Sequence, residues 1–353
     1  MLVDELDTPQ LVLDLDALRE NLVRYQRYFD EQGIKLRPHI KTHKTLAVAA
    51  MQMDCGAVGL TCQKVGEAEV MLAGGLDVDM LISYNIIGDS KLDRLVALAR
   101  QTRITVTADS TYVLQGYSAA AAVNDVILGV LIEIDCGNQR TGVTSVEEAV
   151  ELGKLAHTLP GLELRGIMGF PTPPSVGPFL HEVVEAYAQA GLPCPVVSGG
   201  STKSALQAHE IPELTEYRIG EYAVGGAGHL AAGRHTLEQC ALRVIATVVS
   251  HPTQDRVILD SGSKTLSAST METERGVSMG YVVEYPDAHI FACSEEHAHV
   301  DVSRCARKPE IGERVQVLPV HPCPCVNLHD EMVAVRDGQV VGFWPVHARG
   351  KIR

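Results

Sequence analysis

Residues 36–45, LRPHIKTHKT, place two histidines and three cationic side chains within ten positions. If this segment forms a barrel strand, alternation puts Arg37, His39 and Lys41 on one face. Lys41 would then point inward at the carboxyl-terminal mouth, where barrel enzymes carry their active sites, and Lys44 would enter the next helix. An amine at such a place can act as a nucleophile or form a Schiff base. A structural ion pair is the alternative role for Lys41.

A second chemical pattern lies in VHPCPC near the end of the chain, where His321 and Cys323 are separated by one residue. An imidazole nitrogen and a thiolate can bind one divalent ion if the backbone turns at Pro322. Two protein ligands leave positions open for water and substrate, which is typical of a catalytic site. The alternative is a buried thiol beside a chance histidine. Cys325 is an additional thiol without an assigned role.

A glycine-rich segment offers a third kind of site. A phosphate is bound by backbone N–H groups and hydroxyls that can approach it closely. The segment follows the expected seventh strand, a place where barrels commonly bind phosphate. Its residues are Ser198, Gly199, Gly200, Ser201 and Thr202.

Composition narrows the class of protein. The chain has 353 residues, 46% of them hydrophobic and 21% charged, and a net charge of −14. Its 30 Lys and Arg residues are scattered, which argues against a nucleic-acid partner. No apolar run approaches the roughly 20 residues that cross a bilayer, and the first residues resemble no secretory leader. We expect a cytoplasmic protein without a membrane partner, with its nine cysteines reduced.

Alternating strand and helix patterns predict a (β/α)8 barrel over residues 10–232, with a first helix capped by Asp16. No GxGxxG motif follows the first strand, so dinucleotide binding is not indicated. From residue 233 to 353, short β-like runs predict a second domain, β-rich in structure, that includes residues 1–9. The eight expected barrel strands are 34–40, 57–62, 79–85, 103–108, 127–135, 162–170, 194–199 and 216–224.

Seven motifs together resemble one family. The chain contains, in order, RPHIKTHK, EIDCGNQRTGV, SGGST, YRIGEYAVGG, LDSGSKTLS, SEEH and HPCPCVNLHDEM. This series is similar to that of the D-threonine aldolase and eukaryotic-type D-serine dehydratase family over almost the whole chain. Members are pyridoxal-phosphate enzymes of fold type III, with an alanine-racemase-like barrel and a β-domain. The resemblance therefore implies pyridoxal 5'-phosphate as cofactor and a homodimer as the assembly.

The resemblance also assigns residues. It implies that Lys41 forms the internal aldimine and that His39 and His43 line the cofactor site, although either histidine could instead be structural. It implies that Arg140 approaches the phenolic oxygen of the cofactor. Cofactor-binding roles also follow for Arg218, which would face the pyridine nitrogen, and for Tyr222, which would complete the phosphate cup.

His321 and Cys323 coincide with the metal ligands of the family, so a divalent ion such as Mn²⁺, Mg²⁺ or Zn²⁺ is implied. His297, with Glu296 beside it, becomes a candidate for proton transfer. The loop at 166–178, GIMGFPTPPSVGP, departs from the aldolase branch, which has a histidine there. The substrate pocket is therefore expected to differ from one made for D-threonine.

Four functions follow in order of preference. The first is retro-aldol cleavage of D-3-hydroxy amino acids to glycine and an aldehyde, in which the metal lowers the pKa of the substrate hydroxyl. The second is a D-serine or D-3-hydroxyaspartate dehydratase that releases a keto acid and ammonia. A racemase, which needs no metal, is third. A non-catalytic pyridoxal-phosphate carrier is fourth, and it would not need residues 235–353.

Overall fold

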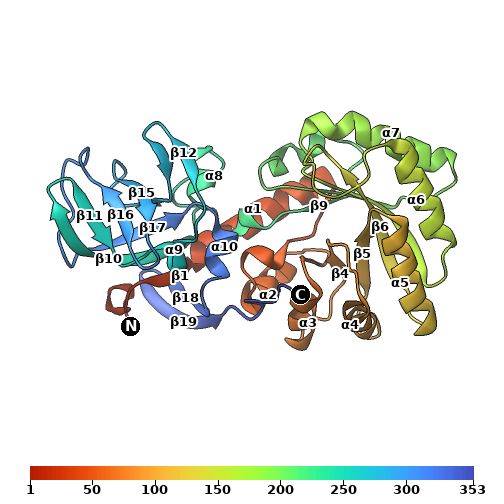
Figure 1. Cartoon of the computed structure of the whole chain (residues 1–353), viewed down its shortest axis with the longest axis horizontal. Helices are drawn as coiled ribbons and strands as arrows, with labels where there is room; N and C mark the ends of the chain where they lie inside the picture. The colour runs from red at the N-terminus through yellow and green to blue at the C-terminus, as the bar shows by residue number, and fades with distance from the viewer. The chain divides into compact units, whose positions relative to one another are not determined.

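The computed structural model describes residues 1–353, and contacts divide them into two compact units. The barrel unit comprises residues 24–41, 48–220 and 351–353, and the β-rich unit comprises residues 1–23, 42–47 and 221–350. Residues 42–47 and 221–232 thus belong to the β-rich unit in this division. The domain limits drawn from the sequence stay a prediction. Figure 1 shows the elements of each unit.

The barrel unit is built on eight parallel strands, one from each strand that the sequence predicts. Their order across the sheet is β2-β9-β8-β7-β6-β5-β4-β3. A parallel bridge between His39 and Thr61 links the chain after β2 to β3, so the two edges of the sheet meet. The predicted alanine-racemase-like barrel is confirmed. The strands are β2 Lys35–Leu36, β3 Leu60–Cys62, β4 Met80–Ile82, β5 Ile104–Ala108, β6 Leu128–Asp135, β7 Leu162–Phe170, β8 Val196–Gly200 and β9 Glu216–Arg218.

Helices join successive strands because a parallel pair needs a crossover connection. Figure 1 shows α3 to α7 on the outer side of the sheet. The helices are α1 Leu15–Gln32, α2 Leu46–Asp54, α3 Val65–Ala73, α4 Asp89–Ala99, α5 Thr111–Val123, α6 Val146–Thr158 and α7 Gly177–Gln189.

The predicted cap of the first helix is wrong by two residues. Asp14 Oδ1 accepts hydrogen bonds from the backbone N–H groups of Asp16 and Ala17, each at 3.0 Å. A side-chain oxygen that satisfies these first free donors defines the N-cap. Asp14 therefore caps α1, and Asp16 lies in its first turn.

The first barrel strand is shorter than predicted. β2 ends at Leu36, and Lys41 lies in a 3-10 turn, η2 (Ile40–Thr42). The main-chain hydrogen bonds run on past Pro38, since the N–H groups of Arg37 and His39 donate to Tyr217 O and Ile219 O at 3.0 and 2.7 Å. Arg37 and His39 therefore keep the same orientation in the ladder, as alternation predicts, whereas Lys41 lies beyond it in η2 and its place on that face stays a prediction. Lys44 is also outside the next helix, since α2 begins at Leu46.

Arg37 has a structural role in the barrel. Its Nε lies 2.7 Å from Glu216 Oε2 and its Nη1 lies 2.9 Å from Asp79 Oδ1. Burial of a guanidinium is tolerated when carboxylates pair with it in this way. A Cβ at Gly59 would overlap Asp79 O and the Arg37 guanidinium, so glycine is needed there.

The β-rich unit is built on a nine-stranded sheet. Seven strands follow the order β15-β16-β11-β10-β1-β18-β19, while β17 pairs with β10 and β14. β1 joins this sheet, antiparallel to β10 and parallel to β18. The predicted β-rich carboxyl-terminal part is thus confirmed. The strands are β1 Gln10–Asp14, β10 Leu242–Thr253, β11 Arg256–Leu259, β14 Gly280–Val282, β15 His289–Cys293, β16 Ala298–Asp301, β17 Arg314–Pro319, β18 Glu331–Arg336 and β19 Gln339–Pro345.

Short elements complete the β-rich unit. A hairpin, β12 (Met271–Thr273) and β13 (Gly276–Ser278), stands apart from the large sheet. Three short helices are α8 (Ala227–Ala231), α9 (Ser263–Leu266) and α10 (Pro322–Val326), and η5 is a 3-10 turn at Glu221–Ala223.

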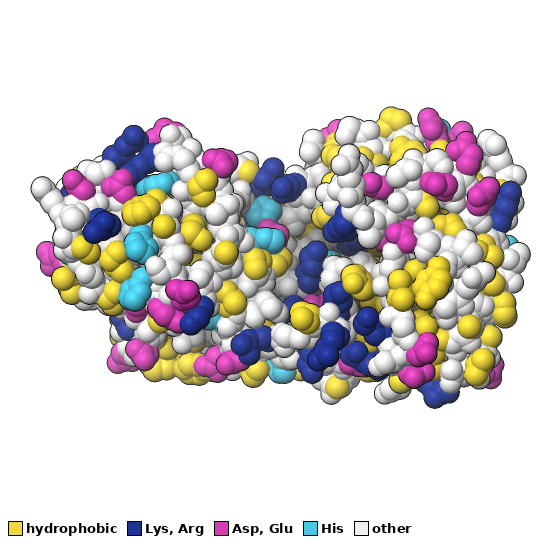
Figure 2. All heavy atoms as spheres, viewed as in Figure 1, with side chains coloured by type: hydrophobic (Ala, Val, Ile, Leu, Met, Phe, Trp, Pro, Cys, Tyr) yellow, Lys and Arg dark blue, Asp and Glu magenta, His cyan; other side chains and the backbone are white.

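None of the helices combines the length and the apolar character needed to cross a bilayer. Figure 2 shows acidic side chains spread over the visible face of both units, together with several histidines on the β-rich unit.

Candidate active site

In the barrel unit, Lys41 and Arg140 lie at the same aromatic ring. Lys41 Nζ is 5.9 Å and the Arg140 guanidinium carbon is 5.1 Å from the centre of the Phe170 ring. Phe170 ends β7, and parallel barrel strands carry their functional groups at this carboxyl-terminal end. The structure therefore brings two of the predicted cofactor residues together. Their cofactor contacts stay a prediction.

His39 is buried near these cations. Its Nε2 lies 3.1 Å from Gln63 Oε1 and 3.5 Å from Ser83 Oγ. Burial, and then the positive charges of Lys41 and Arg218, hold the pKa of His39 well below its ordinary 6.5. His39 is thus a neutral imidazole at physiological pH in this environment. That state suits an acceptor or a positioning group better than a proton donor.

The neutral state of His39 predicts a pH dependence of stability. Below pH 6.5 the unfolded chain takes up a proton at this residue and the folded chain does not. The free energy of unfolding should therefore fall with decreasing pH, by up to about 1.4 kcal/mol per pH unit for this proton. In His39→Gln the decline below pH 6.5 should be flatter by that amount. Urea titrations at several pH values would measure it, and parallel wild-type and variant curves would contradict it.

Arg218 is held by β7 and β8. Its Nε donates to Ser198 Oγ at 2.9 Å and its Nη2 donates to Gly169 O at 2.7 Å. Burial lowers the pKa of Arg218, and the nearby carboxylates of Glu216 and Glu133 counteract that effect. An arginine stays charged under such conditions. A fixed positive charge is therefore present beside Ser198, and its contact with a pyridine nitrogen stays a prediction.

The glycine-rich segment makes several contacts within the protein. The Gly200 N–H donates to Thr172 Oγ1 at 2.8 Å, and the Ser201 N–H donates to Arg218 O at 3.3 Å. A Cβ at Gly199 would lie 2.7 Å from Thr172 Oγ1, so close packing requires that glycine. Two N–H groups that we predicted for phosphate thus already have protein acceptors. Phosphate binding by Ser201 and Thr202 stays a prediction.

Two further predicted residues belong to the β-rich unit. His43 is fully buried, and its Nδ1 accepts from the Thr45 N–H at 3.2 Å. Tyr222 is also buried, in η5, where its carbonyl oxygen lies 3.1 Å from His235 Nε2. Both are fixed by their surroundings, and their cofactor roles stay predictions.

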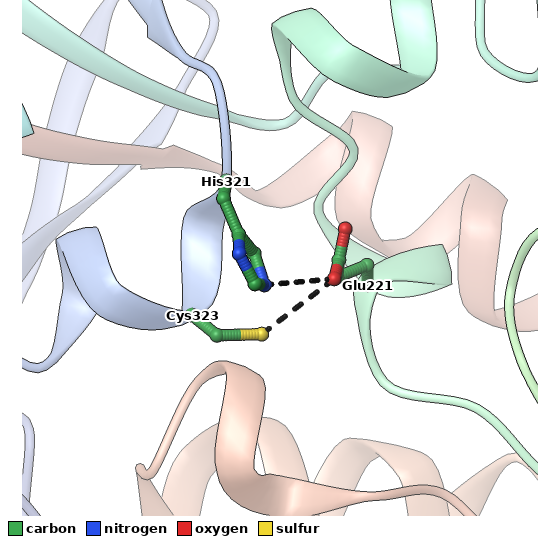
Figure 3. Close-up of side chains that lie close together, drawn as sticks. All are labelled: Glu221, His321 and Cys323. Atoms are coloured by element: carbon green, nitrogen blue, oxygen red, sulfur yellow. Dashed lines mark hydrogen bonds and ion pairs between the residues drawn. The ribbon is translucent and has the colours of Figure 1, made fainter. Parts of the chain in front are cut away.

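The strongest cluster of metal-ligating groups is formed by Glu221, His321 and Cys323. One donor atom from each lies within 4.8 Å of the other two. Figure 3 shows the three side chains pointing toward one another, Glu221 from η5 and the other two from the start of α10. His321 Nε2 is 3.0 Å and Cys323 Sγ is 3.8 Å from Glu221 Oε1. The expected turn at Pro322 is present, since α10 begins there.

Charges within the cluster are strongly coupled. Hydrogen bonds to Cys323 and then Glu221 raise the pKa of His321 to about 10. Burial raises the pKa of Glu221, but contacts with His229 and His321 outweigh it and hold that pKa well below its usual value. A divalent cation would replace the proton that these donors share. The nitrogen, sulfur and oxygen donors therefore fit a zinc-type ion.

Glu221 is the residue that the sequence reasoning missed. In the sequence, Glu221 is a single carboxylate in the run IGEYAVGG. The other residues of this run are typical of packing and turns. Nothing in that run points to positions 321 and 323, a hundred residues away.

Other predicted residues lie outside the cluster. His297 is exposed, in the turn between β15 and β16, and Glu296 forms a surface ion pair with Lys264 at 2.7 Å. Cys325 is buried, and burial raises the pKa of its thiol to about 12, which keeps it protonated. A proton-transfer role for His297 stays a prediction, and its exposure does not favour it.

Comparison with known proteins adds family information. Residues 13–228 match the model of the alanine racemase N-terminal domain, and residues 241–335 match that of a serine dehydratase domain. The chain is 34% identical to D-threonine aldolase of an Arthrobacter species, covering 98% of this chain and 93% of that protein. It is 32% identical to 3-hydroxy-D-aspartate aldolase of Paracoccus denitrificans strain Pd 1222, with the same coverage.

Dehydratases are also among the relatives. D-threo-3-hydroxyaspartate dehydratase of a Delftia species is 31% identical, covering 90% of this chain and 91% of that protein. Among solved structures, D-threonine aldolase from Filomicrobium marinum superimposes with a TM-score of 0.90 at 30% identity, covering 100% of this chain and 99% of that one. An alanine racemase of Clostridium difficile, at 15% identity and a TM-score of 0.69, shares the fold.

Proposed function

Since the chain belongs to the alanine racemase N-terminal domain family, we propose that it is a pyridoxal-phosphate- and divalent-metal-dependent lyase that cleaves D-3-hydroxy amino acids to glycine and an aldehyde. Aldolases of this substrate type are similar to it over nearly their whole length. The metal dependence is supported by one observation above all. The donor atoms of Glu221, His321 and Cys323 lie within 4.8 Å of one another.

The barrel unit would hold the cofactor. Bound pyridoxal phosphate supplies an electron sink for the carbanion left by bond cleavage. Lys41 is the proposed point of attachment, and Arg140 shares the Phe170 ring with it. Arg218, held by Ser198 and Gly169, provides a buried positive charge that cannot be neutralised by deprotonation.

The β-rich unit would hold the metal through His321 and Cys323. A bound divalent ion supplies Lewis acidity, which makes a substrate hydroxyl easier to deprotonate. The Cys323 thiol also lies 3.2 Å from Thr42 Oγ1, and Thr42 follows Lys41 directly in the chain. The proposed roles of Lys41, His321 and Cys323 do not depend on the homodimer, which stays a prediction.

Dehydration is the second candidate function. Residues 241–335, which include His321 and Cys323, match a serine dehydratase domain, and a related dehydratase acts on D-threo-3-hydroxyaspartate. The segment after β7 also has no histidine, since it reads PTPPSVGP from Pro171 to Pro178. Both reactions could use the same lysine and the same metal ligands, so only the products separate them.

A substrate panel tests the proposed function. Incubation with D-threonine, D-phenylserine and D-3-hydroxyaspartate should yield glycine and an aldehyde, and L-threonine serves as the stereochemical control. Glycine and aldehyde would be quantified by chromatography, and keto acid and ammonia by coupled assays. Keto acid with ammonia as the main products would favour the dehydratase instead. Equal turnover of L-threonine would contradict the D-specificity.

A further inference from the structure

We propose that Glu221 is a third protein ligand of the metal and that His229 positions it. This inference rests on the metal site of the proposed function and extends it to two residues that no sequence motif indicated. All four groups, Glu221, His229, His321 and Cys323, belong to the β-rich unit.

The two oxygens of Glu221 have different partners. Oε1 lies 3.0 Å from His321 Nε2 and 3.8 Å from Cys323 Sγ, which is where an ion shared with those donors would sit. Oε2 lies 2.6 Å from His229 Nε2. Because a carboxylate only accepts hydrogen bonds, His229 donates from Nε2. One oxygen is thus available to an ion while the other is fixed (Figure 3 shows Oε1 directed at His321 and Cys323).

The backbone around Glu221 is built for close approach to α10. The N–H groups of Val224 and Gly225 both donate to Glu221 O, at 3.1 and 2.9 Å, and close the turn. A Cβ at Gly226 would lie 2.8 Å from Pro322 Cδ, so the glycine lets this segment meet the start of α10. The Gly228 N–H then donates to Val320 O at 3.2 Å. The carboxylate is therefore carried on a rigid element that touches the one bearing the other ligands.

His229 has the features of a positioning residue. It is 5% exposed, on α8, and its Nδ1 is buried without a hydrogen-bond partner in the protein. Buried polar atoms without partners are uncommon, so packing alone is a poor reason for a histidine here. Its ring packs edge-on against His235, and its hydrogen bond is to Glu221. Groups that orient a ligand in this way are usually important for metal affinity.

A third ligand changes the electrostatics of the site. His321 and Cys323 alone would give a divalent ion one thiolate, leaving a net positive charge. A carboxylate from Glu221 brings the sum of ion and ligands to zero. Such a mixed nitrogen, oxygen and sulfur set favours Zn²⁺ over Mg²⁺, which prefers oxygen ligands. Three protein ligands with one open position also describe catalytic zinc sites.

Zinc affinity of the full-length protein tests this proposal without relying on turnover. Zn²⁺ would be titrated against a chromophoric chelator for the wild type, Glu221→Gln and His229→Gln. His229→Gln should weaken binding by about 10–100-fold, and Glu221→Gln by at least as much. His289→Gln is the matched control, because His289 is 8% exposed and lies on β15. The absorption spectrum of the Co²⁺-substituted protein should change in Glu221→Gln and keep its thiolate band.

The outcomes separate this inference from the proposed function. Unchanged zinc affinity and an unchanged Co²⁺ spectrum in Glu221→Gln, with loss of both in Cys323→Ala, would overturn the role of Glu221 and leave the two-ligand site intact. Zinc binding that survives both His321→Ala and Cys323→Ala would overturn the metal site itself. Weaker binding in His289→Gln equal to that in His229→Gln would overturn the positioning role. Circular dichroism checks that each variant is folded.

Discussion

Lys41→Ala is expected to abolish the visible absorbance that pyridoxal phosphate acquires on covalent attachment to the protein, and to reduce turnover by several orders of magnitude. Lys41 is the amine that lies at the Phe170 ring with Arg140, and a methyl group cannot attack the cofactor aldehyde. Absorbance spectra of the purified protein and steady-state rates with D-threonine would measure both effects.

Lys44→Ala is the control for this prediction. The Lys44 Nζ donates to Asn327 Oδ1 at 2.8 Å, so the residue has a structural partner in the β-rich unit. The variant should keep the absorbance of the attached cofactor, with some loss of thermal stability. If Lys44→Ala lost that absorbance and Lys41→Ala kept it, the choice of lysine would be refuted.

Removal of the metal should have a comparably large effect. Treatment with EDTA, or the His321→Ala substitution, should reduce aldehyde release by roughly a hundredfold or more, because Lewis-acid stabilisation contributes several kcal/mol to such a reaction. Adding Zn²⁺ or Mn²⁺ back to the EDTA-treated wild type should restore activity, Mg²⁺ should restore less of it, and His321→Ala should not recover. Rates and metal content would be measured on the same samples.

The matched control is His251→Ala, since His251 is half-buried near the end of β10 and its Nε2 lies 3.4 Å from the carbonyl oxygen of Gln254. This variant should keep both its metal and its activity. Full turnover by a protein shown to contain no metal would contradict the role of His321 and Cys323 and would favour the racemase-like alternative, which needs no metal.

Much of the fold could be predicted from local patterns. Each barrel strand is a short apolar run between turn residues and a helix. The sequence therefore predicts all eight strands at positions that overlap those in the structure. The errors lay where single residues decide the local geometry. Lys41 lies in a 3-10 turn and not on a strand, and Asp14 rather than Asp16 caps α1. Such details depend on individual hydrogen bonds, which a periodic pattern does not reveal.

The candidate site was predicted in part for the same reason. His321 and Cys323 are close in sequence, so their spacing alone indicates a shared ion. Glu221 and His229 reach them only through the fold of the segment that Gly226 brings against Pro322. Local spacing is visible in a sequence, whereas convergence across a hundred residues needs the structure.

The contact between Gly226 and Pro322 limits how this enzyme can be altered by laboratory evolution. Libraries that aim at new substrates often randomise residues near a metal, and position 226 would be an obvious choice. Any side chain there would collide with the proline ring and push Glu221 and α10 apart. Diversity is better introduced in the segment after β7, between Pro171 and Pro178, which carries no histidine.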